Sequence, residues 1–315
     1  MTGRAAAPPG LYVGVDLGGT ATRFVATDAH AQVVRSQIVS TPSGADSTDL
    51  EVFLTGAIVS LSEGMSLTAI GVGASGPISR DGIIRNPDTL PAFTGVDVPA
   101  MLNRVFGVPS FIANDAVTAA LGEALRGAGR GFEDILMITL GTGIGVCMLQ
   151  RGEPVRGADG LHPETGHMSI GGSIARCYCG RDTCWEQAAS RSALQRACAA
   201  LVVNPTNSSQ DIDTMAQLAS AGDQPAISVF DDFGLRLAHG VATLLAVYRP
   251  EVLIIGGSGS AYFTHFRVAL HRTLGGLTGT FPPSTISVAH FGEHGGAIGA
   301  AALAIAEIAR GRPGV

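Results

Sequence analysis

The chain has no run of basic residues and no apolar stretch long enough to cross a bilayer. It carries 20 Lys and Arg against 26 Asp and Glu, a net charge of −6. Binding to a nucleic-acid backbone requires clustered basic side chains, and a membrane span requires about 20 consecutive apolar residues. We therefore expect neither a nucleic acid nor a membrane as a partner, and we expect a cytoplasmic location.

Cysteine is also scarce, and the five present are an odd number. Residues 1–9 form a short tail without the apolar centre of a secretory signal. Together these features argue against a disulfide framework. With 315 residues, 46% of them hydrophobic, the chain is long enough for two domains with sizeable cores.

Two strand–turn–strand segments stand out among the 43 glycines. Residues 11–17 and 23–28 flank the turn Gly18-Gly19-Thr20, and residues 134–140 and 144–149 flank Gly141-Thr142-Gly143. Glycine turns let backbone N–H groups surround an anion, so both turns are candidate phosphate sites. Each turn returns into a strand and not into a helix, which excludes a dinucleotide fingerprint, and no Gly-x-x-x-x-Gly-Lys-Ser/Thr motif is present.

The repetition of this hairpin predicts a duplicated α/β architecture with a cleft between its halves. Asp16 ends the first strand, where a carboxylate is able to hold Mg²⁺ through water. Residues 204–213 are the most polar insertion, and we predict a surface loop there. The remaining periodic segments predict strands over 33–40, 68–74, 110–113 and 251–255, and helices over 49–62, 116–126 and 295–309.

Three cysteines and a histidine lie close together in the middle of the chain. His167, Cys177, Cys179 and Cys184 offer one nitrogen and three sulfurs, which is the ligand set of a closed tetrahedral zinc site. Glu164 and Glu186 flank them and cannot join that sphere without displacing a ligand. The alternative is that the cysteines are packed as small hydrophobes and the histidine is an ordinary loop residue.

Asn114 and Asp115 stand between the strand over 110–113 and the helix over 116–126. One interpretation is a helix N-cap, which either residue type forms well. The other is a general base that accepts a proton from a substrate hydroxyl. The two phosphate turns favour the second interpretation, because they require a partner that activates a nucleophile.

These motifs resemble the ROK family of sugar kinases and repressors, within the actin-like ATPase superfamily. The most specific parts are Asn114-Asp115, residues 140–145, Glu164-Thr165-Gly166-His167 and the segment from Cys177 to Glu186. The resemblance implies an α/β, two-domain, ribonuclease H-like fold with an interdomain cleft. It also implies an ATP-dependent glucokinase-like or fructokinase-like activity on a sugar or polyol, with Mg²⁺, a structural Zn²⁺ and a homodimer or homotetramer.

Residue roles follow from the same resemblance. It implies that Asp115 is the catalytic base and that His167 both binds zinc and faces the sugar. Adenosine is expected near Gly256-Gly257-Ser258 and near Gly296 and Ala297. The residues implied to hold sugar hydroxyls are Asn114, Asp115, Glu164, His167 and Glu186. Those implied to hold nucleotide phosphates and Mg²⁺ are Asp16, Gly18, Gly19, Thr20, Gly141, Thr142 and Gly143.

The chain departs from the family pattern mainly near the substrate. Ala21 stands where many members carry lysine, and His162-Pro163 resembles the fructokinase branch. Trp185, the one tryptophan, either packs against the zinc loop or lines the sugar pocket. The acceptor hydroxyl is expected to be the 6-hydroxyl of a hexose such as glucose or fructose, with an amino sugar or a cyclitol as alternatives.

Other functions remain in view. A repressor of the same family requires a DNA-binding segment before the first strand, where only residues 1–10 stand. A non-catalytic sugar sensor or a polyphosphate-dependent enzyme is a further alternative. The expected domains are residues 1–114 with a C-terminal helix at about 300–315, and residues 115–299 with a zinc loop over 162–186.

Overall fold

The structure is a computed structural model that describes residues 10–44, 47–79, 81–172, 175–278, 285–292, 294–312 and 314. The predicted N-terminal tail over residues 1–9 lies outside these ranges. The chain divides into two compact units. Unit 1 comprises residues 1–133, 151–163 and 290–315, and unit 2 comprises residues 134–150 and 164–289. Along the described ranges, no helix is both long and apolar enough to cross a membrane.

Unit 1 is built on a mixed sheet with the strand order β3-β2-β1-β4-β5. β1 and β2 form the predicted antiparallel hairpin, whereas β4 and β5 join β1 in parallel. Apart from the half-buried Leu67, the apolar residues of β1 and β4 are buried, as expected for central strands with both faces covered. The strands are β1 (Leu11–Leu17), β2 (Ala21–Thr27), β3 (Val33–Ser40), β4 (Leu67–Ala74) and β5 (Ser110–Asn114).

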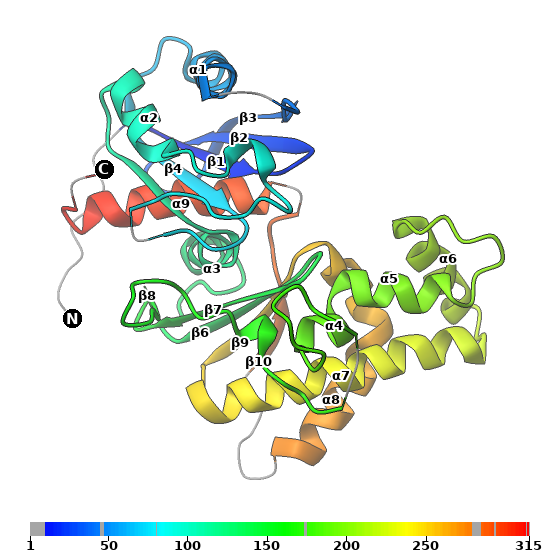
Figure 1. The fold of residues 1–315 in the computed structure, drawn as a ribbon. Helices are drawn as coiled ribbons and strands as arrows, with labels where there is room; N and C mark the ends of the chain where they lie inside the picture. The colour runs from blue at the N-terminus through cyan, green and yellow to red at the C-terminus, as the bar shows by residue number, and fades with distance from the viewer. Residues whose placement is uncertain are drawn as a thin grey trace. The chain divides into compact units, whose positions relative to one another are not determined.

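Helices cover both faces of this sheet (Figure 1). α1 (Ser47–Ser62) and α2 (Val98–Phe106) pack over one face, and α9 (Gly295–Ala309) packs over the other, with α3 (Asp115–Arg126) behind it. Asp97 caps α2 by accepting from the Ala100 N–H at 2.9 Å. A large apolar cluster between the sheet, α1 and α2 forms the main core of the unit.

α9 approaches the sheet so closely that side chains are excluded from the contact. A Cβ on Gly14 of β1 would lie 1.9 Å from the Ala297 carbonyl oxygen, and one on Gly71 of β4 would lie 1.8 Å from that of Ala300. The absence of a Cβ at both positions therefore lets the helix backbone rest directly on the strands. This packing brings the N-terminus of α9 next to the end of β1.

Unit 2 contains the second predicted hairpin. β6 (Ile135–Leu140) and β7 (Ile144–Gln150) are antiparallel, and β9 (Val252–Gly256) joins β6 in parallel. β10 (Thr285–Val288) extends the sheet beyond β9. The strand order is β10-β9-β6-β7-β8. β8 is the short segment Glu153–Pro154, which the division into compact units groups with unit 1.

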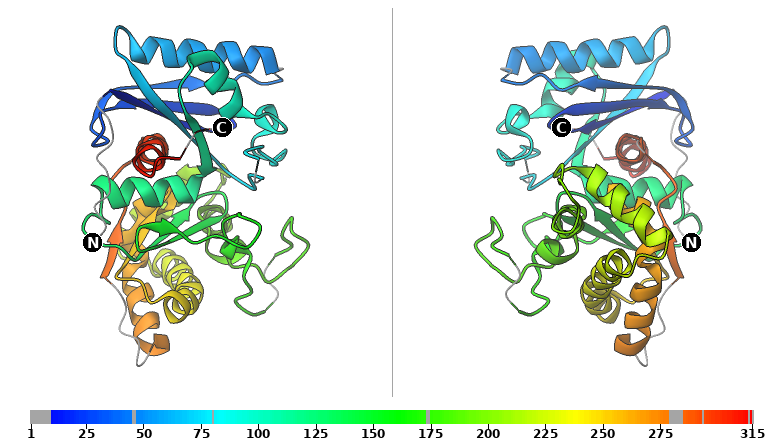
Figure 2. Two further views of the ribbon diagram at one scale, coloured as in Figure 1. Left: turned by 90° about the vertical axis from the view of Figure 1, so that its left-hand side faces the viewer. Right: turned by 90° about the vertical axis from the view of Figure 1, so that its right-hand side faces the viewer.

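The helices of unit 2 pack mostly on one another. α7 (Gln224–Tyr248) lies alongside α8 (Phe263–Thr278), as two further views show in yellow and orange (Figure 2). α7 also contacts α4 (Trp185–Ala189). Asp223 caps α7 by accepting from the Ala226 N–H at 2.9 Å. The other helices are α5 (Arg191–Ala199) and α6 (Ser209–Ser220).

The predicted elements are confirmed in type, and the main error falls on a polar segment. Residues 204–213 were expected to form a loop, but α6 begins at Ser209. Ser208 caps α6 through the Gln210 N–H at 3.2 Å, and buried Asp211 accepts from the Thr206 N–H at 2.9 Å. The sequence predicted a loop here because the polar side chains that cap a helix N-terminus also form hydrogen bonds in turns.

The compact units group α3 with the first sheet, whereas the expected domain boundary was placed between residues 114 and 115. The C-terminal helix begins earlier than the 300–315 of that division, at Gly295. Compactness alone does not test which parts of the chain move together, so the expected division into domains stays a prediction.

Candidate functional site

The cysteine and histidine ligands of unit 2 are brought together by two short backbone pairings. Ser169 and Cys184 form an isolated antiparallel bridge, and the Trp185 N–H donates to the Met168 carbonyl at 2.9 Å. This pairing places His167 beside Cys184. The remaining cysteines lie on a tight turn closed by the Gly180 N–H and the Cys177 carbonyl at 2.9 Å, in which Gly180 has φ +90°.

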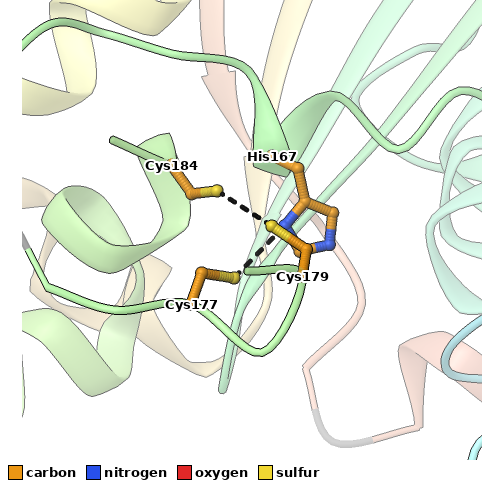
Figure 3. A group of neighbouring side chains, drawn as sticks. All are labelled: His167, Cys177, Cys179 and Cys184. Atoms are coloured by element: carbon orange, nitrogen blue, oxygen red, sulfur yellow. Dashed lines mark hydrogen bonds between the residues drawn. The ribbon is translucent and has the colours of Figure 1, made fainter. Parts of the chain in front are cut away.

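The four ligand atoms of His167, Cys177, Cys179 and Cys184 all lie within 4.8 Å of one another (Figure 3). The His167 Nδ1 and Cys177 Sγ atoms are 3.5 Å apart, and the Cys179 and Cys184 Sγ atoms are 3.4 Å apart. A tetrahedral zinc with ordinary bond lengths separates sulfur from nitrogen by about 3.5 Å and sulfur from sulfur by about 3.8 Å. The donor set and its spacing therefore fit a zinc ion.

The surroundings of the thiols differ. Burial raises the pKa of the Cys184 thiol to about 12, whereas a backbone hydrogen bond lowers the pKa of Cys179. Cys177 and Cys184 are buried, whereas Cys179 is exposed. The other two cysteines, Cys147 and Cys198, are buried in β7 and α5, as expected for core residues.

Glu186 links the ligand cluster to the second glycine turn. Its Oε1 atom lies 3.3 Å from His167 Nδ1 and 3.1 Å from Cys177 Sγ. A Cβ added to Gly143 would lie only 2.4 Å from Glu186 Oε2, so the missing side chain of Gly143 makes room for this carboxylate. The candidate phosphate-binding turn at Gly143 is therefore in contact with Glu186, a candidate sugar-binding residue.

Glu164 belongs to the same neighbourhood. The surrounding protein raises its pKa by desolvation, His167 lowers it and Glu186 raises it again, although much of the side chain still contacts solvent. Gly166 packs against β7 so closely that a Cβ would lie 2.2 Å from the Ile144 carbonyl oxygen. The strand that follows the glycine turn therefore also supports the segment that carries Glu164 and His167.

Trp185 does not line a pocket in this structure. It is 0% exposed, its Nε1 donates to the Arg236 carbonyl at 3.1 Å, and a Cβ on Gly240 of α7 would lie 2.1 Å from its ring. Of the two roles that the sequence allowed for Trp185, the structure shows packing and not pocket lining, and the side chain packs against α7. This contact anchors α4, which begins at Trp185 and carries Glu186.

The glycine segment Gly256-Gly257-Ser258 and the turn Gly141-Thr142-Gly143 lie at the same end of the sheet, where neighbouring parallel strands end. β9 runs parallel to β6 with Gly256 opposite Thr139, so Gly256-Gly257-Ser258 follows β9 where Gly141-Thr142-Gly143 follows β6. Gly257 has φ +74°, and a Cβ there would lie 2.7 Å from backbone atoms of Leu140. Glycine is therefore required by the local backbone, in addition to any ligand it binds.

Unit 1 carries the other candidate residues. Asp16 lies against the first turn of α9, where a Cβ on Gly296 would be 2.5 Å from its carboxyl carbon. Burial raises the pKa of Asp16 to about 6, while Arg23 lowers it. In the first glycine turn, Cβ atoms on Gly18 and Gly19 would clash with the carbonyl oxygens of Ala21 and Thr89, so backbone packing alone already requires both glycines.

Asn114, and not Asp115, is the N-cap of α3. Its Oδ1 accepts from the Ala116 N–H at 2.8 Å, and its Nδ2 donates to the Gly76 carbonyl at 3.3 Å. Asp115 is the first residue of the helix, and its Oδ1 also accepts from the Ala116 N–H at 2.8 Å. The capping interpretation therefore applies to Asn114, and the Asp115 carboxylate also lies in the first turn of α3, where a negative charge is favourable.

One residue of the site was not singled out from the sequence. The Tyr178 hydroxyl lies 2.7 Å from Nε2 of His167, the ring nitrogen opposite the one that faces the Cys177 sulfur. Its position between Cys177 and Cys179 was the available signal, because a side chain inside a ligand loop must point either toward the ligands or into solvent.

The architecture is shared with solved structures. A ROK family glucokinase from Streptomyces griseus, crystallised with glucose and AMPPNP, matches with a TM-score of 0.77 at 28% identity, over 93% of this chain and 99% of its own. A ROK hexokinase from Thermus thermophilus matches with a TM-score of 0.81 at 29% identity, over 95% and 99% of the two chains. The two sheets and their helices therefore define a two-domain α/β fold of the actin-like ATPase type.

The ROK family model matches residues 12–307, and the chain belongs to the ROK family. A glucokinase from Thermotoga maritima is 31% identical over 256 residues, which cover 78% of this chain and 81% of that protein. The resemblance identified from the motifs is confirmed.

Proposed function

We propose that this protein transfers the γ-phosphoryl group of ATP to a hydroxyl of a sugar. The carrying observation is the contact of Glu186 with both Gly143 and the His167–Cys177 pair in unit 2. A sugar kinase needs a phosphate-binding turn beside groups that hold a polyol, and the proximity of these candidate residues supports that arrangement. The ROK glucokinases among the matched proteins support the same class of reaction.

The sugar would be held by carboxylates, an amide and an imidazole. Glu164 and Glu186 accept hydrogen bonds from hydroxyls, and the Asn114 side chain offers a donor and an acceptor. Asp115 would accept the proton of the attacking hydroxyl as general base. The acceptor we propose is the 6-hydroxyl of a hexose, with glucose as the first candidate because the relatives just described are glucokinases.

Zinc is proposed as the ion held by His167, Cys177, Cys179 and Cys184. Bound through Nδ1, it would leave the remaining proton of His167 on Nε2 and so fix that nitrogen as a hydrogen-bond donor. The ring orientation would then depend on the metal loop and not on the sugar.

The nucleotide would be held by the glycine segments and by Asp16. ATP would supply the transferred phosphoryl group. The residues that would hold its phosphates are those of the glycine turns Gly18-Gly19-Thr20 and Gly141-Thr142-Gly143. Those that would hold its adenosine are Gly256-Gly257-Ser258, Gly296 and Ala297. Asp16 fits Mg²⁺, since its carboxylate is partly buried and already costs free energy to keep charged.

That cost predicts a pH-dependent effect of Asp16→Asn. Because the folded pKa of about 6 lies above the ordinary aspartate value of 3.8, the native state binds the proton more tightly, so stability falls as the pH rises from about 4 to 6. Asparagine carries no charge to desolvate. Without added Mg²⁺ we expect the variant to be more stable than wild type at pH 7.5, by at most about 3 kcal/mol, and the gap to shrink at pH 5.

Urea unfolding at the two pH values measures this gap. Asp88→Asn, which changes an exposed carboxylate of the same unit, is the matched control and should leave stability nearly unchanged at both pH values. An Asp16→Asn protein that is less stable than wild type at pH 7.5 would contradict the assigned burial cost.

The test of the proposed function is an ATP-consumption screen of purified protein with Mg²⁺ and a panel of hexoses, ketoses, amino sugars and cyclitols. We expect turnover on at least one hexose and identification of the product as its 6-phosphate. Turnover confined to an amino sugar or a cyclitol would retain the reaction class and correct the acceptor. Repeating the screen with polyphosphate tests the alternative donor.

A non-catalytic sugar sensor is the second candidate, because the family also includes repressors. The xylose repressor of Bacillus subtilis is 27% identical over 254 residues, covering 79% of this chain and 64% of that protein. Sugar binding without phosphoryl transfer from any donor would favour this candidate. The homodimer or homotetramer implied by the family stays a prediction, which light scattering tests.

A further inference from the structure

The nitrogen of His167 that the proposed mechanism assigns to the sugar already has a partner within the chain. The Tyr178 hydroxyl lies 2.7 Å from Nε2, and the two rings meet edge to face with centroids 5.0 Å apart and an interplanar angle of 83°. The opposite nitrogen, Nδ1, faces the cysteine sulfurs (Figure 3). Tyr178 therefore stands on the substrate side of the ring.

The surroundings of this hydroxyl are those proposed for a sugar hydroxyl. Besides His167, the carboxylates of Glu186 and Glu164 lie near enough to act electrostatically on the Tyr178 phenol. Like a sugar hydroxyl, the phenol is both a donor and an acceptor. All of these residues belong to unit 2.

The Tyr178 side chain is able to leave while its backbone stays in place. The residue is 76% exposed, so a rotated side chain loses little buried area. Cys177 and Cys179 lie on either side of it in the ligand cluster, and the turn is closed by the Cys177 N–H and the Arg181 carbonyl at 2.8 Å. Movement is therefore a rotation about the side-chain bonds and not a shift of the loop.

We propose that Tyr178 is an internal ligand that an acceptor sugar displaces. In the free protein its hydroxyl accepts the hydrogen bond of His167 Nε2–H, and a hydroxyl of the sugar takes over that bond as the phenol rotates into solvent. This inference rests on the proposed function. It makes Tyr178 a specificity-determining residue, because a sugar that lacks a hydroxyl at that position has nothing to replace the bond it breaks.

The test is Tyr178→Phe, which removes the hydroxyl and keeps the ring. We expect the Kd of the sugar, measured by calorimetry on the zinc-loaded protein, to fall about fivefold, since the competing hydrogen bond is absent. The KM should fall in parallel, and kcat should change less than KM. The ¹⁵N and ¹H resonances of His167 Nε2–H should shift in the free variant, and zinc content should stay at the wild-type value.

The matched control is Tyr262→Phe. The Tyr262 hydroxyl donates to Asp213 at 2.7 Å in the same unit, so the control removes an equivalent tyrosine hydrogen bond at a surface away from the cluster. We expect it to leave the sugar Kd and the His167 resonances unchanged.

Each other outcome overturns the proposal in a distinguishable way. Weaker sugar binding with intact zinc would make the hydroxyl a direct substrate contact, and lost zinc would make it a structural support. A Tyr178→Phe protein with an unchanged sugar Kd and ordinary turnover would refute the displacement of Tyr178 but would remain consistent with the proposed kinase function. A wild-type protein that neither binds nor phosphorylates any sugar would overturn the proposed function and the displacement with it.

Discussion

Replacing Asp115 with asparagine is expected to lower kcat by a factor of about 10²–10⁴, the usual contribution of a general base. The Kd of the sugar should change much less, because asparagine keeps an oxygen and a similar shape. The fold should survive, since Asn114 caps α3 through the Ala116 N–H at 2.8 Å and does not depend on the Asp115 charge. Steady-state kinetics at saturating sugar and ATP, with calorimetry of sugar binding, measures both quantities.

Asp97→Asn is the matched control for this variant. Asp97 also stands at the start of a helix in unit 1, where its carboxylate accepts from the Ala100 N–H. It should lose a little stability and no turnover. An Asp115→Asn protein with near-native kcat would remove Asp115 from the role of base, and equal losses in both variants would reduce its effect to helix capping.

Replacing Cys179 with serine is expected to remove the bound zinc and at least about tenfold of the sugar affinity. Structural zinc contributes folding free energy directly, because the ligands are ordered only around the metal. Without it, the segment from Cys177 to Cys184 and the orientation of the His167 ring both lose their support. Metal analysis, thermal unfolding and sugar titration of the same preparation measure the three effects.

Cys198→Ala separates loss of metal from loss of a buried cysteine. Cys198 is fully buried in α5 outside the ligand cluster, so this variant should lose some stability through its cavity. It should keep its zinc and its sugar affinity. A Cys179→Ser protein with full zinc content and native activity would refute the role of Cys179 as a zinc ligand that supports the loop.

The sequence predicted the two hairpins and the glycine turns well because their information is local. Short apolar runs with a Gly-Gly-Thr or Gly-Thr-Gly turn between them specify strand, turn and returning strand within about twenty residues. The Cys177-x-Cys179 spacing likewise specifies a turn whose two sulfurs face the same side. His167 and Cys184 were assigned to that cluster from nearby sequence, and the structure brings all four ligand atoms together.

The errors and omissions concern contacts between distant segments. The start of α6 was read as a loop because Ser208 and Asp211 serve equally well in turns. From the sequence either Asn114 or Asp115 could cap the helix, and only the backbone of α3, which begins at Asp115, identifies Asn114 as the cap. Tyr178 was not predicted as a site residue, because its position between Cys177 and Cys179 does not specify the direction of its side chain.

By itself, the sequence determined the strand–turn–strand units, the ligand set of the proposed zinc site and the family with its class of reaction. These rest on residues close together in the chain or on motifs that are specific as written. Only the tertiary structure decided that Trp185 is buried against Gly240, that α9 rests on Gly14 and Gly71, and that Tyr178 contacts His167. Those contacts join distant segments or depend on a side-chain rotation, and both are selected by the packing of the whole unit.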